Sequence, residues 1–435
     1  MAGVVARLKT ALDERISVED YLAWSTAIAV VMFVPLRGSF QIGYVFVIVN
    51  TVILLALDRL NIHRNHMLAL LALAGFSFFG AAASGTPLNA PASQIVGISL
   101  LSVYFFCALT VMGRSLTLWM EMYMRAAFAI AIVGLVKWAG AHILHLGLGE
   151  TRLTSIYTEP SFFVYCTLPA VGYCVNLFAK ERRYGLETLF FLLSYALANS
   201  ALGFLGLLLI GIFVYMPRLK GWQLLAGAAA VCIVLAGLYV ASGEVRQRAV
   251  EMVNAIAKQD LTSAGNTTFA FLSNVYVTSQ SFKDHPFTGI GLGGYANAYD
   301  KYIQDVTGID ITNLNSNVGR DLQNSMQLNR DDAASMFLRV AAELGIPGIA
   351  CLIGFLIVCA RVRTEPFLTL RNAILPYLIV RMTRLGHYFT VELYFFTGIY
   401  LFNYLNYRRA SKMGSPFVNT STYSREMQPG PRPVL

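Results

Sequence analysis

The sequence is poor in charge, and this shortage excludes most soluble folds. Only 13% of the 435 residues are Asp, Glu, Lys or Arg, and 56% are hydrophobic. A soluble domain carries roughly 25% charged residues. The mean hydropathy is +0.57, and the apolar residues arrive in long blocks separated by short polar joins. The composition therefore predicts an all-α polytopic membrane protein.

Residue patterns for a metal site are also lacking. The six cysteines show no ligand spacing, and all lie inside apolar blocks, where we expect them to be small buried hydrophobic side chains. His142 and His145 face nearly the same way on one apolar block, but no third ligand is evident. We therefore expect no metal ion and no other cofactor.

A nucleotide site is not predicted either. Gly289, Gly291 and Gly294 match the spacing G-x-G-x-x-G, but no strand precedes them. We expect a tight turn that returns the chain to the membrane. A formal net charge of +9 would suggest nucleic-acid binding in a soluble protein. Here the positions of the basic residues instead indicate how the protein is oriented in the membrane.

Apolar blocks of membrane-spanning length recur along the chain. They cover residues 21–36, 42–57, 67–83, 95–112, 126–146, 162–178, 188–216, 222–241, 333–360, 373–385 and 389–405. Block 188–216 is ambiguous, because it exceeds the roughly 20 residues of one span and is too short for two full ones. Asn199 and Ser200 lie at its middle.

Charge decides between one span and two. If block 188–216 is a hairpin that turns at Asn199 and Ser200, most of the 33 Lys and Arg residues fall on one side of the membrane. If it is a single span, the basic joins after it move to the other side. The positive-inside rule favours the hairpin, about twelve spans, and cytoplasmic N- and C-termini.

These spans predict four parts of the chain. We expect an N-terminal membrane bundle of nine spans (1–241), an external loop subdomain (242–332), three C-terminal spans (333–405) and a disordered cytoplasmic tail (406–435). No cleavable signal peptide is expected, because the first span lacks a cleavage site after it. Within the external part, residues 244–258 and 269–282 are predicted helices, and residues 313–329 are a predicted mobile loop.

Charged side chains gather at the external ends of the predicted spans. The set comprises Arg152, Glu159, Arg330, Asp331, Asp332, Arg339, Glu343, Arg381, Arg384, His387 and Glu392. Arginines at external ends run against the positive-inside rule, which places basic residues mostly on the cytoplasmic side. One interpretation is salt bridges at helix ends, and the other is an anion site, because the arginine fork binds phosphate and stays charged.

An anion at a membrane surface suggests a lipid-linked substrate. A polyprenyl pyrophosphate that carries sugars would need several arginines at headgroup level and a polar, aromatic-lined space outside. Tyrosines 276, 295, 299 and 302 could stack on sugar rings, although tyrosines also pack small folds.

Three motifs together resemble the O-antigen polymerase and ligase superfamily. They are F-K-D-H-P-F-T-G-I-G-L-G-G-Y at 282–295, S-M-F-L-R-V-A-A-E-L-G-I-P-G at 335–348, and the join R-L-T-S-I-Y-T-E-P-S at 152–161. The resemblance implies an integral-membrane glycosyltransferase of GT-C-like fold that needs neither metal nor nucleotide. Its substrate would be oligosaccharide linked to undecaprenyl pyrophosphate, at the periplasmic face of a bacterial inner membrane.

A polymerase of the Wzy type is the preferred interpretation. Ligases of this superfamily carry a His eight or nine residues before the Glu of the E-x-G motif, where this chain has Ser335 or Ala334. An exopolysaccharide such as xanthan is one candidate product, and a chain-length-regulating co-polymerase and a flippase are candidate partners. Transfer of glycan to a lipid or protein acceptor remains the alternative within the enzyme class. A flippase of the same substrate, with Lys137 and Glu392 as its charged path, is the alternative outside it.

Each predicted site residue has a role in this mechanism. Glu159, or else Asp332, would take the proton from the acceptor hydroxyl. The predicted substrate contacts are Arg152, Tyr157, Tyr295, Arg330, Arg339, Arg381, Arg384 and His387. Among them, Arg152, Arg330, Arg381 and Arg384 would stabilise the charge that develops on the departing pyrophosphate.

Overall fold

The structure is a computed structural model, and it is helical in almost all of its described parts. It describes residues 17–32, 35–37, 40–60, 62–113, 116–143, 152–215, 266–307 and 330–412, together with the single positions 246, 250 and 253. The helices are α2 (Val18–Val31), α3 (Ile42–Ala56), α4 (Arg64–Ser84), α5 (Asn89–Val111), α6 (Leu116–His142), α7 (Pro160–Glu181), α8 (Gly185–Ala198), α9 (Ala201–Tyr215), α12 (Asn266–Asp284), α13 (Tyr295–Thr307), α15 (Met336–Cys359), α16 (Phe367–Arg384) and α17 (Val391–Lys412). Two short antiparallel strands, β1 (Pro35–Arg37) and β2 (Phe40–Gln41), join α2 to α3.

The predicted division of block 188–216 into two helices that meet at Asn199 and Ser200 is confirmed. Helix α8 ends at Ala198, and its C-cap Asn199 adopts the left-handed conformation with a φ of 43°. Asparagine tolerates this conformation better than most residues. The chain then turns at Ser200 and begins α9 at Ala201. The predicted helix at 269–282 is likewise confirmed within α12.

The helices support a multi-pass membrane protein. Five of the described helices (α4, α5, α6, α7 and α15) are long and apolar enough to cross a membrane, and α3, α8 and α9 are shorter apolar helices. The count of twelve spans, the GT-C-like fold, the four-part division and the orientation stay predictions. The predicted span 222–241, the helix 244–258 apart from three positions, the loop 313–329 and the tail from 413 onward lie outside the described residues.

Helices α7 and α16 form the centre of the bundle and run antiparallel. Gly172 of α7 lies against the backbone of Ala373, since an added Cβ would come within 2.9 Å of its Cα. Towards the end of α7, Lys180 reaches Thr369 near the start of α16, with its Nζ 2.9 Å from the hydroxyl. The N-terminal end of α7 and the C-terminal end of α16 therefore lie at the same end of the bundle.

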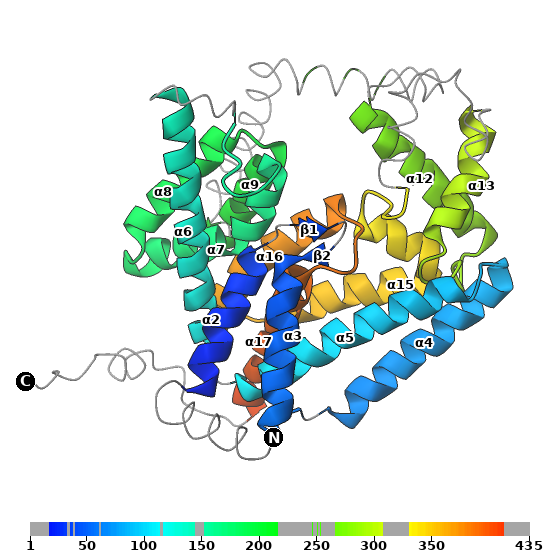
Figure 1. Cartoon of the computed structure of the whole chain (residues 1–435), viewed down its shortest axis with the longest axis horizontal. Helices are drawn as coiled ribbons and strands as arrows, with labels where there is room; N and C mark the ends of the chain where they lie inside the picture. The colour runs from blue at the N-terminus through cyan, green and yellow to red at the C-terminus, as the bar shows by residue number, and fades with distance from the viewer. Residues whose placement is uncertain are drawn as a thin grey trace, which may run out of the picture.

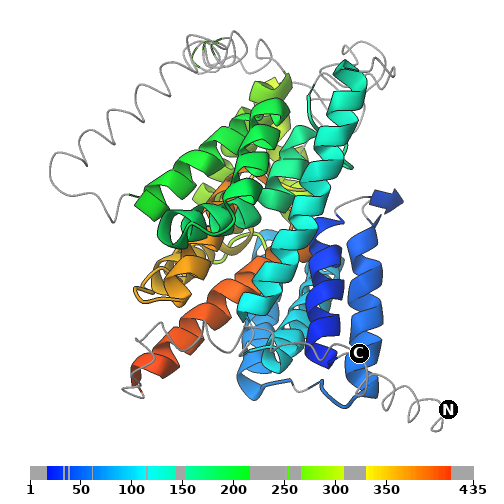
Figure 2. The same ribbon diagram turned by 90° about the vertical axis from the view of Figure 1, so that its left-hand side faces the viewer.

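Other helices surround this pair. Helices α6, α8 and α9 lie beside α7, while α2 packs against α3 and α6 (Figures 1 and 2). Aromatic rings of α6 and α17 meet in the core, where Trp119 and Phe395 have centroids 5.1 Å apart. This packing positions α17 beside α16, where the end of α16 meets the start of α17.

The segment that contains α12 and α13 has a small core of its own. Helices α12 and α13 pack against one another and against the first half of α15 (Figure 1). Phe269, Val277, Tyr295, Tyr299 and Ala342 belong to one buried cluster. The segment is thereby fixed over the end of α15 where the charged residues gather.

Candidate active site at the mouth of α15, α16 and α17

Helix α15 is broken at Gly345, and the break exposes backbone groups that the glycine loop satisfies. Gly345 has a φ of 62° and a ψ of −155°, which is not helical. Glycine adopts such a conformation without a Cβ penalty. The carbonyl oxygens of Ala342 and Glu343 accept the N–H groups of Ile290 and Gly291, each at 3.0 Å. The N–H of Ile346 donates in turn to the carbonyl of Pro286 at 2.8 Å.

The glycine cluster thus has a structural explanation. Gly289, Gly291 and Gly293 all have a positive φ, and the Cβ of an alanine at position 289 would lie 2.2 Å from the carbonyl oxygen of Glu343. The tight turn predicted for this cluster is confirmed, and it packs directly on the break in α15. The loop also reaches α4, because the N–H of Leu292 donates to the Ser77 hydroxyl at 2.8 Å.

Glu343 is fully buried next to this break and has three partners. Its Oε1 accepts the N–H of Gly293 at 2.9 Å and the Nε of Arg339 at 3.1 Å. Its Oε2 accepts the hydroxyl of Tyr388 at 2.9 Å. A buried carboxylate requires this kind of compensation, since its desolvation is costly. Glu343 therefore joins the glycine loop, α15 and the segment between α16 and α17.

Arg339 connects Glu343 to the aqueous edge of the site. Its side chain is only 4% exposed, and its Nη1 donates to Asp332 at 3.0 Å and to the Gly386 carbonyl at 3.2 Å. Its guanidinium carbon lies 4.3 Å from the centre of the Tyr388 ring, a cation–π contact. The arginine is held from every side, so it presents a fixed positive charge.

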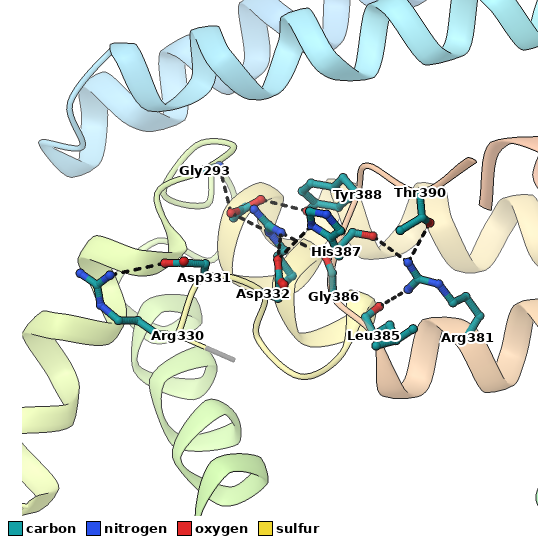
Figure 3. A network of polar contacts seen from close by, with 12 residues as sticks. Gly293, Arg330, Asp331, Asp332, Arg381, Leu385, Gly386, His387, Tyr388 and Thr390 are labelled. Carbon is teal, nitrogen blue, oxygen red and sulfur yellow. Dashed lines mark hydrogen bonds and ion pairs between the residues drawn. The ribbon is translucent and has the colours of Figure 1, made fainter. Parts of the chain in front are cut away.

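Asp332 and His387 meet beside this arginine. Nδ1 of His387 lies 3.3 Å from Oδ1 of Asp332, and both side chains are partly exposed, at 29% and 39% (Figure 3). Burial of Asp332 raises the pKa of its carboxyl group. The hydrogen bond from His387 and the charges of His387, Arg339 and Arg381 lower that pKa by more, so the net pKa is below its usual value. Asp332 is therefore ionised at neutral pH.

Tyr388 follows His387 and completes the network. Burial, together with the charge of Glu343, raises the pKa of the Tyr388 hydroxyl well above its usual value. The hydroxyl therefore stays protonated and donates to Glu343.

A second buried pair lies at the end of α16. Arg381 is fully buried, with its Nε 3.5 Å from Oε1 of Glu392. Its Nη atoms donate to the carbonyls of Leu385 and His387 and to the Thr390 hydroxyl, at 2.6, 2.9 and 3.0 Å (Figure 3). Arg381 thus shapes the segment that carries His387.

Arg384 is in a different environment from Arg381. It is partly exposed and makes no hydrogen bond or ion pair to any residue that the structure describes. The charges of Arg381, Arg384 and Glu159 all act on the hydroxyl of Tyr165 in α7. Arg384 and Glu159 therefore lie at the same mouth, as the antiparallel pairing of α7 and α16 requires.

Glu159 is exposed at the N-cap of α7, and its Oε2 accepts the Ser161 hydroxyl at 3.0 Å. Pro160 follows at the first helical position, where a missing N–H costs nothing. The Glu159 carboxylate thus lies at the N-terminus of α7, and the charge of Arg381 acts both on Tyr165 in that helix and on Asp332.

Four other predicted site residues lie apart from this network or have side chains that are bonded to other protein groups. Arg330 pairs with both carboxylate oxygens of Asp300 and lies to one side of Asp332 in Figure 3. Tyr157 is buried, and its hydroxyl donates to the carbonyl of Val31 at 2.6 Å. Tyr295 is buried, with its hydroxyl 2.8 Å from Oδ1 of Asn274. Arg152 is partly buried, and the substrate contacts of all four residues stay predictions.

The sequence interpretation missed part of this site. Glu343 and Glu392 were named in the charged set but were given no part in the proposed transfer reaction, and Tyr388 and Gly386 were not named. The E-x-G motif contained the signal for Glu343. Tyr388 and Gly386 had no signal beyond their position next to His387.

The apolar helices and the buried arginine–carboxylate network at their mouth define a helical multi-pass membrane protein with a candidate active site at one end of its bundle. The sequence model of a family described as O-antigen ligase matches residues 187–353, from α8 into α15. The match confirms the predicted resemblance to the O-antigen polymerase and ligase superfamily over this segment. It includes Asp332, Arg339 and Glu343, but not His387. No curated protein matches the chain.

Proposed function

We propose that this protein is a glycosyltransferase that joins oligosaccharide repeat units carried on undecaprenyl pyrophosphate into a surface polysaccharide or exopolysaccharide. The reaction would take place at the periplasmic face of a bacterial inner membrane. The family match supports glycan transfer from a lipid carrier, and the absence of the ligase-type histidine at Ser335 supports a polymerase.

The observation that carries the proposal is the pairing of Asp332 with His387 next to the fixed charge of Arg339. A partly exposed acid–base pair beside buried arginines at a helix mouth suits a reaction between an alcohol and a phosphorylated sugar. The arginines attract the pyrophosphate, and the acid–base pair serves the alcohol.

The proposed step is a displacement at the anomeric carbon of the donor sugar. A hydroxyl oxygen of the acceptor sugar forms a bond to that carbon while the bond from the carbon to the pyrophosphate oxygen breaks. The electron pair of the broken bond leaves with the lipid pyrophosphate. The hydroxyl proton passes to a base on the protein. Arg384, which has no partner among the described residues, would bind the departing phosphate.

His387 is the base that this geometry favours. Asp332 holds Nδ1 of the imidazole, so Nε2 remains for the acceptor proton. The lowered pKa of Asp332 makes its own carboxylate a poor proton acceptor and a good orienting group. Glu159, on the α7 side of the mouth, remains the rival base.

The test uses the purified full-length protein and a lipid-linked repeat unit without added nucleotide or metal. We expect a ladder of polymers from the wild-type protein. H387N and D332N should lower the rate by about 10²–10⁴-fold, the usual contribution of a positioned base, and E159Q should lower it much less. A full ladder from both H387N and D332N, or no ladder from folded wild-type protein, would contradict the proposal.

Ligation to a lipid or protein acceptor is the second candidate function. The family description names a ligase, and His387 brings a histidine to the site from the segment after α16. The missing histidine near Ser335 is therefore a weaker argument against ligation than the sequence alone indicates. Addition of a lipid A core acceptor to the same assay distinguishes the two, because a ligase would give one transferred glycan and no ladder.

The transporter alternative has less support. Lys137 donates to the carbonyl of Ser155 at 3.1 Å, and Glu392 is buried against Arg381. Both charges are compensated inside the protein, as a lysine on an apolar helix requires. They do not form the open charged path that the flippase hypothesis needs.

A further inference from the structure

A second cluster of arginines lies at the opposite end of the helices that carry the candidate active site. Arg361 and Arg363 follow α15, and Arg408 lies in the last turns of α17. Together with Tyr404 and Tyr407 they line a cavity of about 420 Å³. The His387 network lies at the other ends of α15, α16 and α17. Helix α17, which begins just after the His387 segment and carries Arg408 in its last turns, has 22 residues and is roughly 33 Å long, which exceeds the roughly 30 Å hydrocarbon thickness of a bilayer.

Within the part of the chain that the structure describes, the three arginines have no carboxylate partner. None of them forms an ion pair or a side-chain hydrogen bond with any residue that the structure describes. The nearby carboxylate of Glu365 is occupied by Lys180 and Thr369. Three cations around one cavity without a carboxylate repel one another unless an anion binds between them.

The backbone around the cavity is held in place by contacts that leave the three arginine side chains available. Arg371 donates from Nη1 to the carbonyls of Ala360 and Val362, at 3.2 and 2.9 Å, so Arg361 and Arg363 emerge on either side of the buried Val362. Asn403 of α17 donates to the carbonyl of Phe367 at 2.8 Å.

The aromatic wall is also ordered. The Tyr407 ring packs edge-on against Phe367, with their centroids 6.1 Å apart. Tyr404, Tyr407 and Arg408 follow helical spacing and therefore share one face of α17. The arginine forks and tyrosine rings face the cavity from two segments whose relative positions are fixed.

We propose that this cavity binds the phosphate-bearing headgroup of an anionic membrane lipid in the leaflet opposite the active site. The arginine fork matches phosphate oxygens bidentately, and tyrosine rings are suited to the boundary between headgroups and acyl chains. Basic pockets between membrane helices are known to take such headgroups. The inference concerns a separate site and does not depend on the reaction proposed above.

Lipid retention by the purified full-length protein tests this proposal. Native mass spectrometry would compare retention of phosphatidylglycerol with that of phosphatidylcholine. We expect the wild-type protein to retain the anionic lipid preferentially, and R361Q/R363Q/R408Q to lose about tenfold or more of that preference. The single variants R363Q and R408Q give the same readout if the triple variant does not fold.

A charge-matched control separates this site from general attraction to basic surfaces. Arg64, Arg409 and Lys412 are exposed and do not line the cavity, so R64Q/R409Q/K412Q should retain phosphatidylglycerol as the wild type does. Equal losses in both triple variants, or no loss in R361Q/R363Q/R408Q, would overturn the proposal. Displacement of the lipid by glycerol phosphate at the same concentration would assign the cavity to a soluble phosphate ester instead and would also overturn it.

Discussion

Gly386 lies directly against the backbone of Asp332, so closely that a Cβ at position 386 would be 1.4 Å from the Asp332 carbonyl oxygen. The carbonyl of Gly386 also accepts Nη1 of Arg339. Its neighbour His387 reaches the Asp332 side chain. This approach of two backbones places the histidine, the aspartate and the arginine in one site.

Replacement of Gly386 by alanine should disrupt this site. No side-chain rotation can relieve a clash between a Cβ and a backbone oxygen, so the two segments must separate. We expect G386A to lower the free energy of unfolding by about 2–4 kcal/mol and to abolish glycan transfer. Thermal melting and the transfer assay measure the two effects. G75A is the control, because an added Cβ there has no atom within 4 Å, and it should leave transfer unchanged and stability unchanged or slightly raised, since Gly75 lies inside α4.

The break in α15 makes a second prediction. At Gly345, with its φ of 62°, an added Cβ would lie 2.4 Å from the carbonyl oxygen of Pro286. G345A should therefore displace the glycine loop from Glu343 and reduce both stability and activity. G354A lies in the same helix with no atom near its Cβ, and it should be neutral or slightly stabilising, since alanine favours a helix by about 1 kcal/mol over glycine. Comparable losses in both variants would show that the break has no special role.

Local features such as the break at Gly345 leave a signal in the sequence. The motif E-L-G-I-P-G signals a departure from a regular helix, and the loop around Gly289 and Gly291 is recognisable as a turn from its glycines alone. The hairpin at Asn199 could be predicted, because charge distribution and span length constrain topology.

Contacts between distant segments could not be predicted in this way. The pairing of Asp332 with His387 joins segments more than fifty positions apart, and it depends on how α15, α16 and α17 pack. The charged residues at one set of span ends indicated the region of the site, but not which arginines are neutralised inside the protein. Arg330 and Arg381 look alike in sequence, yet one pairs with Asp300 and the other with Glu392.

Asp332 makes stability depend on pH. Its pKa in the folded protein is below its usual value, so its stabilising effect is fully present above the pKa of the unfolded chain, about 3.9, and is lost as the pH falls through the lower folded value. We expect the melting temperature of D332N to lie below that of the wild type at pH 6, and the difference to shrink as the pH falls from about 5 towards 3. Melting curves across this range measure it, and a constant or growing difference would contradict the lowered pKa.

Arg339 should not tolerate lysine. The guanidinium contacts Asp332, Glu343 and Gly386 at once and stacks on Tyr388, whereas an ammonium group is a compact charge without the planar fork. We expect R339K to destabilise the protein measurably and to lower transfer at least as strongly as D332N. The exposed R409K provides the matched control and should leave melting and transfer unchanged.

Substitutions at Arg381 and Arg384 should have different effects, the first on stability and the second on the transfer rate. Arg381 is buried against Glu392, so R381Q leaves a buried carboxylate without its partner and should cost about 3–5 kcal/mol of stability. Arg384 is partly exposed and makes no hydrogen bond or ion pair among the described residues, so R384Q should melt as the wild type does. If Arg384 binds the departing pyrophosphate, R384Q should still lower the transfer rate by about 10²-fold, the typical loss of one group that stabilises developing charge. Normal transfer by folded R384Q would remove Arg384 from the mechanism, whereas R384K should recover part of the rate because a positive charge remains at the mouth.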